Sequence, residues 1–292
     1  MAQAALVRHE DGYFEVAAKP DAETLAAYYR DKYYGARDGR SQYAHGYTDE
    51  ELEHKRLSAA EAEAEAVAAR PPGRLLEIGV GEGFSLDYFA GRGWDVRGID
   101  FTDDGLRPFF PELADRLQTG DAFALLDAAI DAGEVYDLVI CNNVVEHVID
   151  PFGLLTRLRR LVAPGGLMRL AAPNDGSWLH RLIVERGMAK PDFWVNAPEH
   201  LSYFTADSLT RLMQRAGWKV EHLLAEFPVD LFLLNPDTAY TVEPTKGRNC
   251  HFVRIAFEMG LWREGIDKVV AFRRGCAAAG VGRNLGAYAR PA

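Results

Sequence analysis

A glycine-rich segment near residue 80 has the composition of a loop that binds a nucleotide-like ligand. Glu77-Ile78-Gly79-Val80-Gly81-Glu82-Gly83 follows a short apolar run and precedes a helical pattern. Glycines let the backbone turn sharply there and let a ligand approach closely. The spacing is GxGxG, and Phe84 stands where a dinucleotide site would place its third glycine. This spacing disfavours a dehydrogenase, and no Gly-Lys-Ser/Thr follows to make a Walker A loop.

Two acidic residues downstream extend this candidate site. Asp100 ends the next predicted strand, 21 residues beyond Gly79, where a carboxylate can accept both ribose hydroxyl protons. Gly120-Asp121-Ala122 follows a third predicted strand, with an acid placed to reach an adenine amino group. Taken singly, each acid is explained equally well as a helix N-cap or a solvated loop residue. Acids at three successive strand ends, Glu77 included, favour a ligand that contains adenosine.

Two Glu-His pairs could carry acid–base chemistry. They are Glu146-His147 and Glu199-His200, and both are expected near strand carboxyl ends. The histidine pKa lies near operating pH, so His147 and His200 are candidate general bases, with Glu146 beside the first. The structural alternative is that these pairs cap helices or tie loops to the sheet.

A polar set in the last quarter of the chain could choose a substrate. Its members are Asp230, Asn235, Tyr240, Lys246, Arg248 and His251. Hydrogen-bonding groups among aromatic residues suit a polyhydroxylated or anionic acceptor, such as a sugar or a sugar phosphate. Lys246 and Arg248 flank a glycine and could bind a phosphate. The alternative is a solvated helix face, because exposed polar residues are the norm.

Alternating strands and helices must position these residues. Strands are predicted at 74–78, 94–99, 117–120, 136–141 and 167–172, with helices at 85–92, 104–116, 123–132 and 152–161 and a turn at 164–166. This alternation predicts parallel βαβ units in an α/β, doubly wound, mostly parallel sheet. Ligands of such sheets bind at the carboxyl ends of the strands, where the glycine loop and the acids fall.

The remaining segments complete a predicted seven-stranded sheet. The sixth strand is predicted at 219–225 and the seventh at 282–290, with helices at 178–184 and 206–216 before them. We divide the chain into a helical N-terminal lid (1–73, an irregular start followed by helices at 21–34 and 49–70), a cofactor-binding core (74–226), a helical insertion acting as a substrate cap (227–280) and the final core strand (281–292). A connection this long is usually functional.

Composition narrows the partners and the location. The 292 residues are 48% hydrophobic and carry a net charge of −10, which argues against a nucleic-acid backbone partner and favours a small-molecule substrate. The three cysteines form no CxxC pair, so we expect neither a disulfide framework nor a zinc site. No signal-peptide pattern and no run of about 18 apolar residues occurs, so we expect no membrane span and a cytoplasmic location.

At these residues the sequence resembles the class I S-adenosylmethionine-dependent methyltransferases, over about half the chain (75–221). The matching segments are LLEIGVGEGFSLDYFA (75–90), GID (98–100), YDLVICNNVVEHVIDP (136–151) and LRRLVAPGGLMRLAAPN (158–174). The subgroup that contains the ubiquinone-pathway O-methyltransferases is most similar, through Glu146-His147 and the EHLSYF segment at 199–204.

The resemblance implies a Rossmann-like methyltransferase fold, S-adenosyl-L-methionine as cofactor, and a role for each matching residue. The methionine part would be held by Glu77, Gly79, Gly81 and Gly83. Asp100 would bind the ribose and Phe101 the adenine face, Asp121 and Ala122 would contact the adenine edge, and Asn142 would lie beneath the sulfonium. Tyr43, His45 or Tyr47 could close over the carboxylate end.

The function implied is methyl transfer to a small molecule, with O-methylation of a hydroxyl and a histidine base as the leading hypothesis. N- or C-methylation and a non-catalytic cofactor-binding protein are the alternatives. Nucleic-acid methylation is disfavoured, because Cys141-Asn142-Asn143-Val144 replaces the [DNS]PP[YF] turn of base-amino methyltransferases. We expect no catalytic metal, because Asn143 stands where related quinone-pathway enzymes place a carboxylate and hard cations prefer more oxygen ligands. A homodimer is left open.

Overall fold

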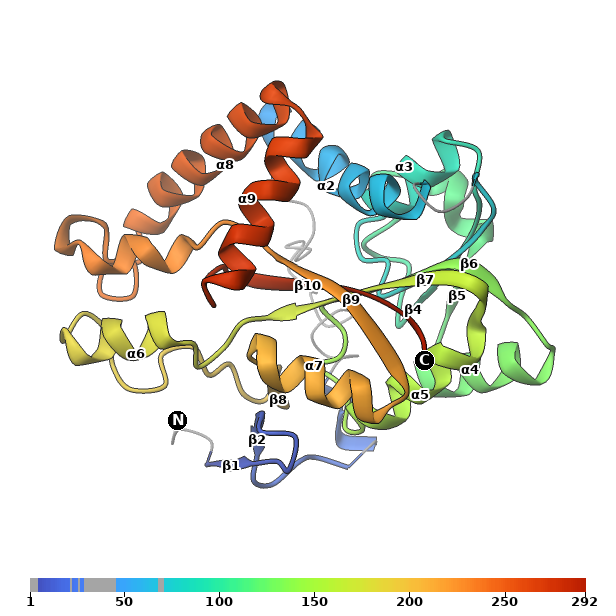
Figure 1. Cartoon of the computed structure of the whole chain (residues 1–292), viewed down its shortest axis with the longest axis horizontal. Coiled ribbons are helices and arrows are strands. Elements are labelled where there is room, and N and C mark those ends of the chain that lie inside the picture. The colour runs from blue at the N-terminus through green and yellow to red at the C-terminus, as the bar shows by residue number, and fades with distance from the viewer. Residues whose placement is uncertain (1–4, 22, 26, 29–45, 68–70) are drawn as a thin grey trace.

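The computed structural model describes the chain except for residues 1–4, 22, 26, 29–45 and 68–70. Within the described residues, seven strands form the main sheet in the order β5-β4-β3-β6-β7-β10-β9 (Figure 1). These strands are β5 (Leu117–Thr119), β4 (Asp95–Asp100), β3 (Arg74–Ile78), β6 (Tyr136–Asn142), β7 (Val162–Pro173), β10 (Asn284–Pro291) and β9 (Trp218–Ala225). Six of these strands run in the same direction, and β10 runs opposite to them, between β7 and β9. The predicted α/β, doubly wound, mostly parallel sheet is confirmed.

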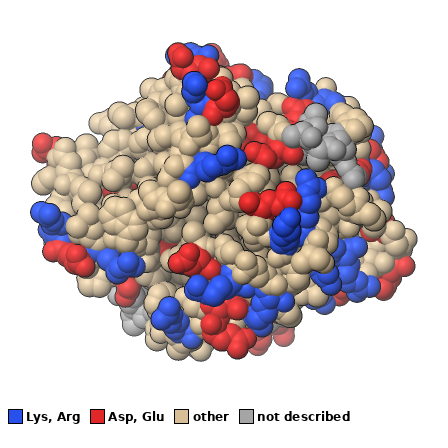
Figure 2. All heavy atoms as spheres, viewed as in Figure 1, with Lys and Arg blue, Asp and Glu red and all other residues tan. Residues whose placement is uncertain are grey.

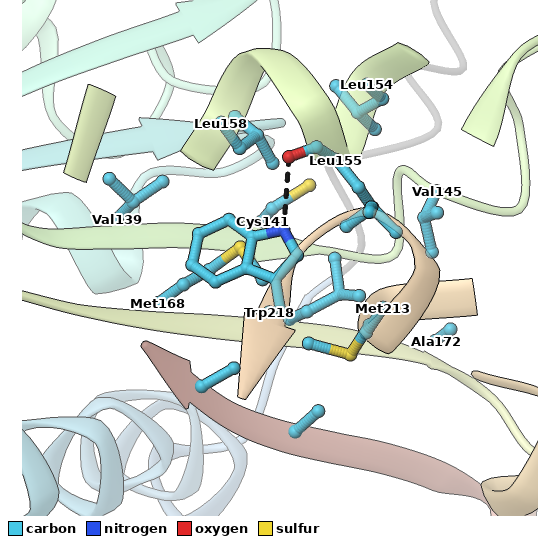
Figure 3. Close-up of a cluster of buried hydrophobic side chains, with 14 of the residues drawn as sticks. Val139, Cys141, Val145, Leu154, Leu155, Leu158, Met168, Ala172, Met213 and Trp218 are labelled. Carbon is cyan, nitrogen blue, oxygen red and sulfur yellow. Dashed lines mark hydrogen bonds between the residues drawn. The ribbon is translucent and has the colours of Figure 1, made fainter. Parts of the chain in front are cut away.

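Helices cover both faces of this sheet, which is why its central strands read as continuous apolar runs. On one face lie α4 (Ala122–Asp131), α5 (Pro151–Leu161) and α7 (Ala206–Arg215). There Trp218 is fully enclosed, and its indole N–H donates to the Leu155 carbonyl at 3.1 Å (Figure 3). The opposite face is covered by α2 (Asp49–Val67) and α3 (Phe84–Gly91). The resulting two-sided core fixes the strand ends that carry the predicted site.

Two predicted elements of the core differ from the structure. Residues 104–109 form turns rather than helix, and a 3₁₀ helix (η1, Pro111–Arg116) follows. Pro108 and Pro111 lack the N–H that a continuous helix would need. The predicted turn at 164–166 lies inside β7, where the register against β6 jumps from Tyr136↔Val162 to Leu138↔Leu167. The extra residues are absorbed as an irregularity of one long strand.

The start of the N-terminal region, predicted to be irregular, contains two strands. Strands β1 (Leu6–Arg8) and β2 (Phe14–Val16) form a hairpin that pairs with β8 (Ser202–Tyr203), making a small second sheet among the described residues. These strands are too short for a clear alternating pattern, and their partner lies far along the chain. Helix α2 confirms the second predicted helix, and most of the predicted helix 21–34 lies outside the described residues.

The segment between β9 and β10 is helical, as predicted. It contains the 3₁₀ helices η2 (Val229–Leu234) and η3 (Pro236–Thr238), then α8 (Lys246–Glu264) and α9 (Ile266–Ala278). Helix α8 contacts α2, and α9 packs on β9, so the insertion extends the layer on the α2 side (Figure 1). A further helix, α6 (Trp178–Glu185), follows β7 and contacts η2.

The surface is charged but mixed in sign. On the face seen in Figure 2, the described acidic and basic residues are interspersed without a large patch of either sign. Among the helices that the structure describes, none is both long and apolar enough to cross a membrane.

Candidate active site

A cavity of about 920 Å³ opens at the carboxyl ends of the central parallel strands. Most of the predicted cofactor residues that the structure describes line it: Tyr47, Gly79, Gly81, Asp100, Phe101, Asp121, Ala122 and Asn142. Glu77 and Gly83 are placed directly behind this lining, in β3 and at the N-cap of α3. Tyr43 and His45 lie outside the described residues. The strand–loop–helix order therefore brings the predicted set together.

The glycine loop needs glycine for two separate reasons. Gly79 and Gly81 have φ of 76° and 57°, in the left-handed region that other residues rarely adopt. A Cβ on Gly79 would also clash with the Val144 side chain. Both the backbone conformation and the packing against the loop after β6 therefore depend on the absence of a side chain.

Asp100 ties this loop to the neighbouring strand. Its Oδ2 accepts the Gly81 N–H at 2.9 Å, and its Oδ1 accepts the Phe101 N–H at 2.6 Å. Burial raises the pKa of Asp100, an effect that the backbone N–H groups oppose. Each oxygen retains lone-pair capacity beyond these bonds, so the carboxylate can still accept from a ligand hydroxyl.

Glu77 is a buried acid that the described residues leave partly unsatisfied. Its residue is 3% exposed, and its Oε2 has no hydrogen-bond partner among the described residues. Burial raises the pKa of Glu77 to about 8. A buried carboxyl group is costly unless it is paired, so this position fits a ligand that brings a positive charge or N–H donors. The methionine ammonium of S-adenosylmethionine is such a group.

A contact that the sequence did not predict joins α2 to the glycine loop. The Tyr47 hydroxyl donates to Glu82 Oε1 at 2.6 Å, and Lys55 Nζ donates to Glu82 Oε2 at 2.6 Å. The Lys55 ammonium also lies 4.4 Å from the centre of the Tyr47 ring. Glu82 occupies a variable position of the GxGxG pattern, so spacing alone could not identify it. Tyr47 lines the cavity, and its role at the carboxylate end of the cofactor stays a prediction.

Of the two histidines proposed as bases, the structure places His147 at the cavity. Its Nδ1 lies 2.8 Å from the Glu199 carbonyl oxygen. A carbonyl only accepts, so Nδ1 carries the hydrogen and Nε2 is the proton-accepting atom of the neutral ring. His200 is not among the described residues lining the cavity, but its ring packs edge-on against His147 at 4.8 Å between centroids.

Glu146 completes this group from a buried position. It is 1% exposed, its Oε1 lies 3.7 Å from His147 Nε2, and burial raises its pKa to about 8. Ligand atoms of Glu146, His147 and His200 lie within 4.8 Å of one another, close enough to hold one metal ion. One carboxylate and two imidazoles are a poor oxygen set for a hard cation, so the absence of a catalytic metal stays a prediction.

The six residues of the predicted substrate set are placed elsewhere, and none is among the described residues that line the cavity. Asp230 is buried between His180 Nε2 at 3.0 Å and the Tyr240 hydroxyl at 2.8 Å. Burial alone would raise the pKa of Asp230, but the bonds from His180 and Tyr240 and the charge of Arg283 lower it. The contact with His180 attaches η2 to α6, and the contact with Tyr240 attaches η2 to the segment before α8.

Of the other four members, Asn235 caps η3 by accepting the Asp237 N–H at 2.9 Å, and the remaining three contact neighbours within the helical layer. Lys246 pairs with Glu243 at 3.1 Å, the Arg248 guanidinium lies over the Phe252 ring at 5.0 Å, and His251 bonds Glu51 at 2.7 Å. The structure therefore gives these residues structural contacts and does not bring them to the cavity.

The sequence missed several residues of the lining. They are Leu25, Glu82, Phe123, Asn143, Val144, Val148, Ile149, Asp150 and Arg157. Asp150 was recognisable as a helix signal, because it precedes Pro151 and caps α5 through the Gly153 N–H at 2.8 Å. The acids outnumber the bases of the lining, and Arg157 is itself paired with Asp127 at 2.8 Å. The cavity is thus acidic.

Comparison with known proteins gives consistent matches. A family model described as a methyltransferase domain matches residues 44–223. A ubiquinone biosynthesis O-methyltransferase from Dinoroseobacter shibae is 31% identical over 150 residues, covering 49% of this chain and 59% of the relative. A probable S-adenosylmethionine-dependent methyltransferase from Mycolicibacterium smegmatis is 30% identical over 165 residues, covering 55% and 58%. The chain thus spans a little under three fifths of the length of these relatives.

Solved structures agree on the fold. A S-adenosylmethionine-dependent methyltransferase from Archaeoglobus fulgidus superposes with a TM-score of 0.51 at 15% identity, covering 92% of this chain and 99% of that one. The 1,6-didemethyltoxoflavin-N1-methyltransferase of Burkholderia thailandensis, solved with its substrate and S-adenosylhomocysteine, gives 0.52 at 15% identity and covers 99% of both chains. At this identity the likeness concerns the fold alone.

Proposed function

The chain belongs to the class I S-adenosylmethionine-dependent methyltransferases, and on that premise we propose that it methylates a hydroxyl oxygen of a small molecule, with His147 as general base. The observation that carries this proposal is the placement of His147. It lines the cavity next to the predicted cofactor residues, and its Nδ1 bond to the Glu199 carbonyl leaves Nε2 to accept a proton.

The cavity residues fit the cofactor part by part. Glu77 and the glycine loop would hold the methionine part, Asp100 the ribose, and Phe101, Asp121 and Ala122 the adenine. When bound, S-adenosylmethionine supplies a methyl group made electrophilic by the sulfonium charge. The acidic lining favours that cation through simple Coulomb attraction, which is strengthened where water is excluded.

The histidine has the local support that a base needs. When His147 Nε2 takes a hydroxyl proton, its Nδ1–H still donates to the Glu199 carbonyl, so the bond that orients the ring survives the transfer. The edge-on contact with His200 restricts the ring further. His147 therefore acts on the proton, whereas His200 supports its position.

The charges of the site also bear on the acceptor. Asp100, Asp121 and Asp150 line the cavity, and Lys246 and Arg248 lie outside its described lining. An anionic, phosphorylated acceptor would meet repulsion there, so a neutral hydroxylated molecule such as a sugar has more support. The same acids favour a second candidate function, N-methylation of an amine, because an ammonium would be drawn into the cavity before it loses its proton.

The test combines methyl-labelled S-adenosylmethionine with a panel of alcohols, sugars, phenols and amines, and identifies the methylated atom by mass spectrometry. His147→Ala should cut turnover at least about 100-fold while S-adenosylmethionine affinity by calorimetry stays within about twofold. His200→Ala should have a smaller effect, and His9→Ala, in the hairpin, serves as the matched control. Unchanged turnover in His147→Ala contradicts the proposal, whatever the effect of His200→Ala.

Two further arms separate the alternatives. Wild-type turnover that survives chelation supports a base without a metal, whereas loss restored by a divalent cation assigns the Glu146–His147–His200 group to a metal. Binding of S-adenosylmethionine without methyl release to any acceptor class would instead support a non-catalytic binding protein.

A further inference from the structure

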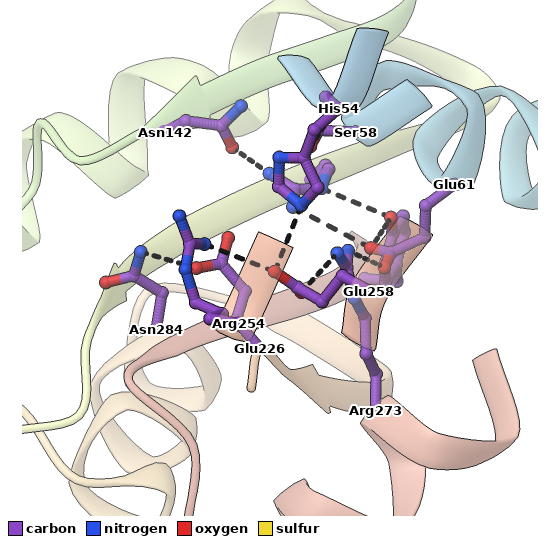
Figure 4. Close-up of polar contacts among 11 residues, drawn as sticks. His54, Ser58, Glu61, Asn142, Glu226, Arg254, Glu258, Arg273 and Asn284 are labelled. Carbon is purple, nitrogen blue, oxygen red and sulfur yellow. Dashed lines mark hydrogen bonds and ion pairs between the residues drawn. The ribbon is translucent and has the colours of Figure 1, made fainter. Parts of the chain in front are cut away.

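A buried network of charged residues lies between the helical layer and the sheet, outside the acid–base group described above (Figure 4). We call it the Arg169 network, and it consists of Glu61 of α2, Arg169 of β7, Glu258 of α8, Arg273 of α9 and Tyr288 of β10. All five residues are buried. Two carboxylates and two guanidinium groups balance one another, which makes burial of the four charges tolerable.

The network begins at a residue of the cavity. Arg169 Nη1 donates to the Oδ1 atom of Asn142, and Arg169 Nε donates to the Tyr288 hydroxyl at 3.2 Å. The Tyr288 hydroxyl in turn donates to Glu61 Oε1 at 2.8 Å. Glu61 also accepts from Arg273 Nη1. Three hydrogen bonds, through Arg169 and Tyr288, therefore connect the C-terminal residue of β6 to helix α2.

Beyond Glu61 the network reaches the insertion. Arg273 Nη2 donates to Glu258 Oε1 at 3.3 Å. Glu258 Oε2 lies 3.0 Å from His54 Nε2 of α2 and 3.2 Å from Arg254 Nη1 of α8. Helices α2, α8 and α9 are thus joined to one another and to Arg169 by ionic contacts.

The chemistry of the first link fixes the orientation of Asn142. A guanidinium has donors and no acceptor, so the amide atom facing Arg169 must be the oxygen. The amide nitrogen is then directed away from the network, as Figure 4 shows, while the residue itself lines the cavity. Among the described contacts, the bond from Arg169 is the one that distinguishes the two flipped orientations of the Asn142 amide.

We propose that Arg169 is a positioning residue that holds the Asn142 amide with its NH₂ group presented to the cavity, and that Glu61 maintains Arg169 in place when α2 and α9 dock on the sheet. The presented NH₂ is a donor for an oxygen of the cofactor or of the acceptor. This inference rests on the proposed function only for the identity of that ligand. The orientation of Asn142 in the free protein is independent of it.

The first measurement observes that orientation without any ligand. The full chain is labelled with ¹⁵N at asparagine, and the Asn142 side-chain NH₂ signals are identified by their loss in Asn142→Asp. In Arg169→Met these two signals should shift or broaden, while the NH₂ signals of Asn235, distant in the insertion, stay in place. Unchanged Asn142 signals would overturn the proposal.

The second measurement is the affinity for S-adenosylmethionine by calorimetry. Asn142→Ala and Arg169→Met should each weaken binding by about 10-fold, the size of one lost hydrogen bond. The double variant should bind no more weakly than Asn142→Ala alone, because Arg169 acts through Asn142. Two full, additive losses would mean that Arg169 affects binding only through general stability.

A charge-balanced variant guards against misfolding. Arg169→Met leaves one excess carboxylate in the network, and adding Glu61→Gln leaves Arg273 paired with Glu258. This double variant should regain folding stability yet keep the weakened affinity and the altered Asn142 signals. Recovery of the wild-type affinity and the wild-type Asn142 signals would mean that Arg169 has only a structural role. Arg254→Gln, which removes a contact of Glu258 and none of Arg169, should leave the S-adenosylmethionine affinity and the Asn142 signals unchanged. If the wild-type chain shows no S-adenosylmethionine binding, the proposed function fails, and the spectroscopic result still decides this inference.

Discussion

Glu77 and Glu61 are both glutamates buried against the same sheet, yet their surroundings are opposite. Glu77 is 3% exposed, one of its oxygens lacks a partner among the described residues, and burial raises its pKa to about 8. Glu61 is 1% exposed. Burial alone would raise its pKa, but the guanidinium groups of Arg273 and Arg169 hold the pKa below its usual value. The chain surrounds Glu61 with two guanidinium groups, whereas at Glu77 the attraction of Arg169 does not offset burial.

The difference separates a structural acid from a binding acid. Where the fold provides cations, as at Glu61, the carboxylate joins elements that are distant in sequence. Where the attraction of nearby cations is too weak to offset burial, as at Glu77, the unfavourable burial is relieved when a cationic ligand binds. Burial alone could not make this distinction, because both residues are equally enclosed.

The largest expected effect is a loss of folding stability at the Arg169 network. Arg273→Met leaves Glu61 and Glu258 short of a counterion in the interior, so the free energy of unfolding should fall by about 3–5 kcal/mol. Chemical denaturation measures it. Arg263→Met on α8, whose side chain is 72% exposed, is the control and should change stability by less than about 0.5 kcal/mol. A loss below about 1 kcal/mol for Arg273→Met would show that the network is dispensable.

Glu77→Gln should weaken cofactor binding and leave folding stability intact. Its affinity for S-adenosylmethionine should fall by about 10- to 100-fold, because a carboxylate that pairs with the ligand is lost. The free protein should be no less stable at pH 8.5, since a neutral amide is easier to bury than an ionised acid. Calorimetry and denaturation give the two numbers. Glu61→Gln, the matched variant, should lower stability instead, and equal behaviour of the two variants would contradict the distinction.

The pH dependence of stability follows from the raised pKa of Glu77. Between about pH 4.5 and pH 8 the folded protein retains a proton on Glu77 that the unfolded chain has released. Raising the pH through this window therefore favours unfolding, and the stabilisation due to this group is complete only below about pH 4.5. The free energy of unfolding of the ligand-free wild-type protein, measured by chemical denaturation, should fall more steeply across this pH window than that of Glu77→Gln. Identical slopes would place the titration elsewhere.

The smallest effects are expected in the insertion. Lys246→Ala and Arg248→Ala should each change stability by less than about 0.5 kcal/mol, because their contacts are surface contacts. Turnover and S-adenosylmethionine affinity should stay at the wild-type values, which the methyl-release assay and calorimetry check. A loss of turnover on a phosphorylated acceptor would restore the interpretation of these residues as a phosphate site.

Sequence reasoning predicted the glycine loop and the strand-end acids because each depends on local order. The alternation of strands and helices places Asp100 and Asp121 at the same edge of the sheet as Gly79, independently of the conformation of the insertion. It did not predict the Arg169 network, because Glu61 lies in an Ala/Glu-rich helix that resembles a solvated one until α8 and α9 cover it. The hairpin 6–16 was missed for a similar reason, since β8 lies nearly 190 residues away.

The position of β10 has a consequence for how this fold can vary. Because β9 and β10 are antiparallel neighbours, the insertion leaves the sheet at Ala225 and returns at the residue paired with it, Leu285. The insertion is therefore topologically the loop of one hairpin, and doubling the length of such a loop costs only about 0.6 kcal/mol in closure entropy. It behaves as an interchangeable module, with one condition: any replacement has to bring a cation to the place of Arg273.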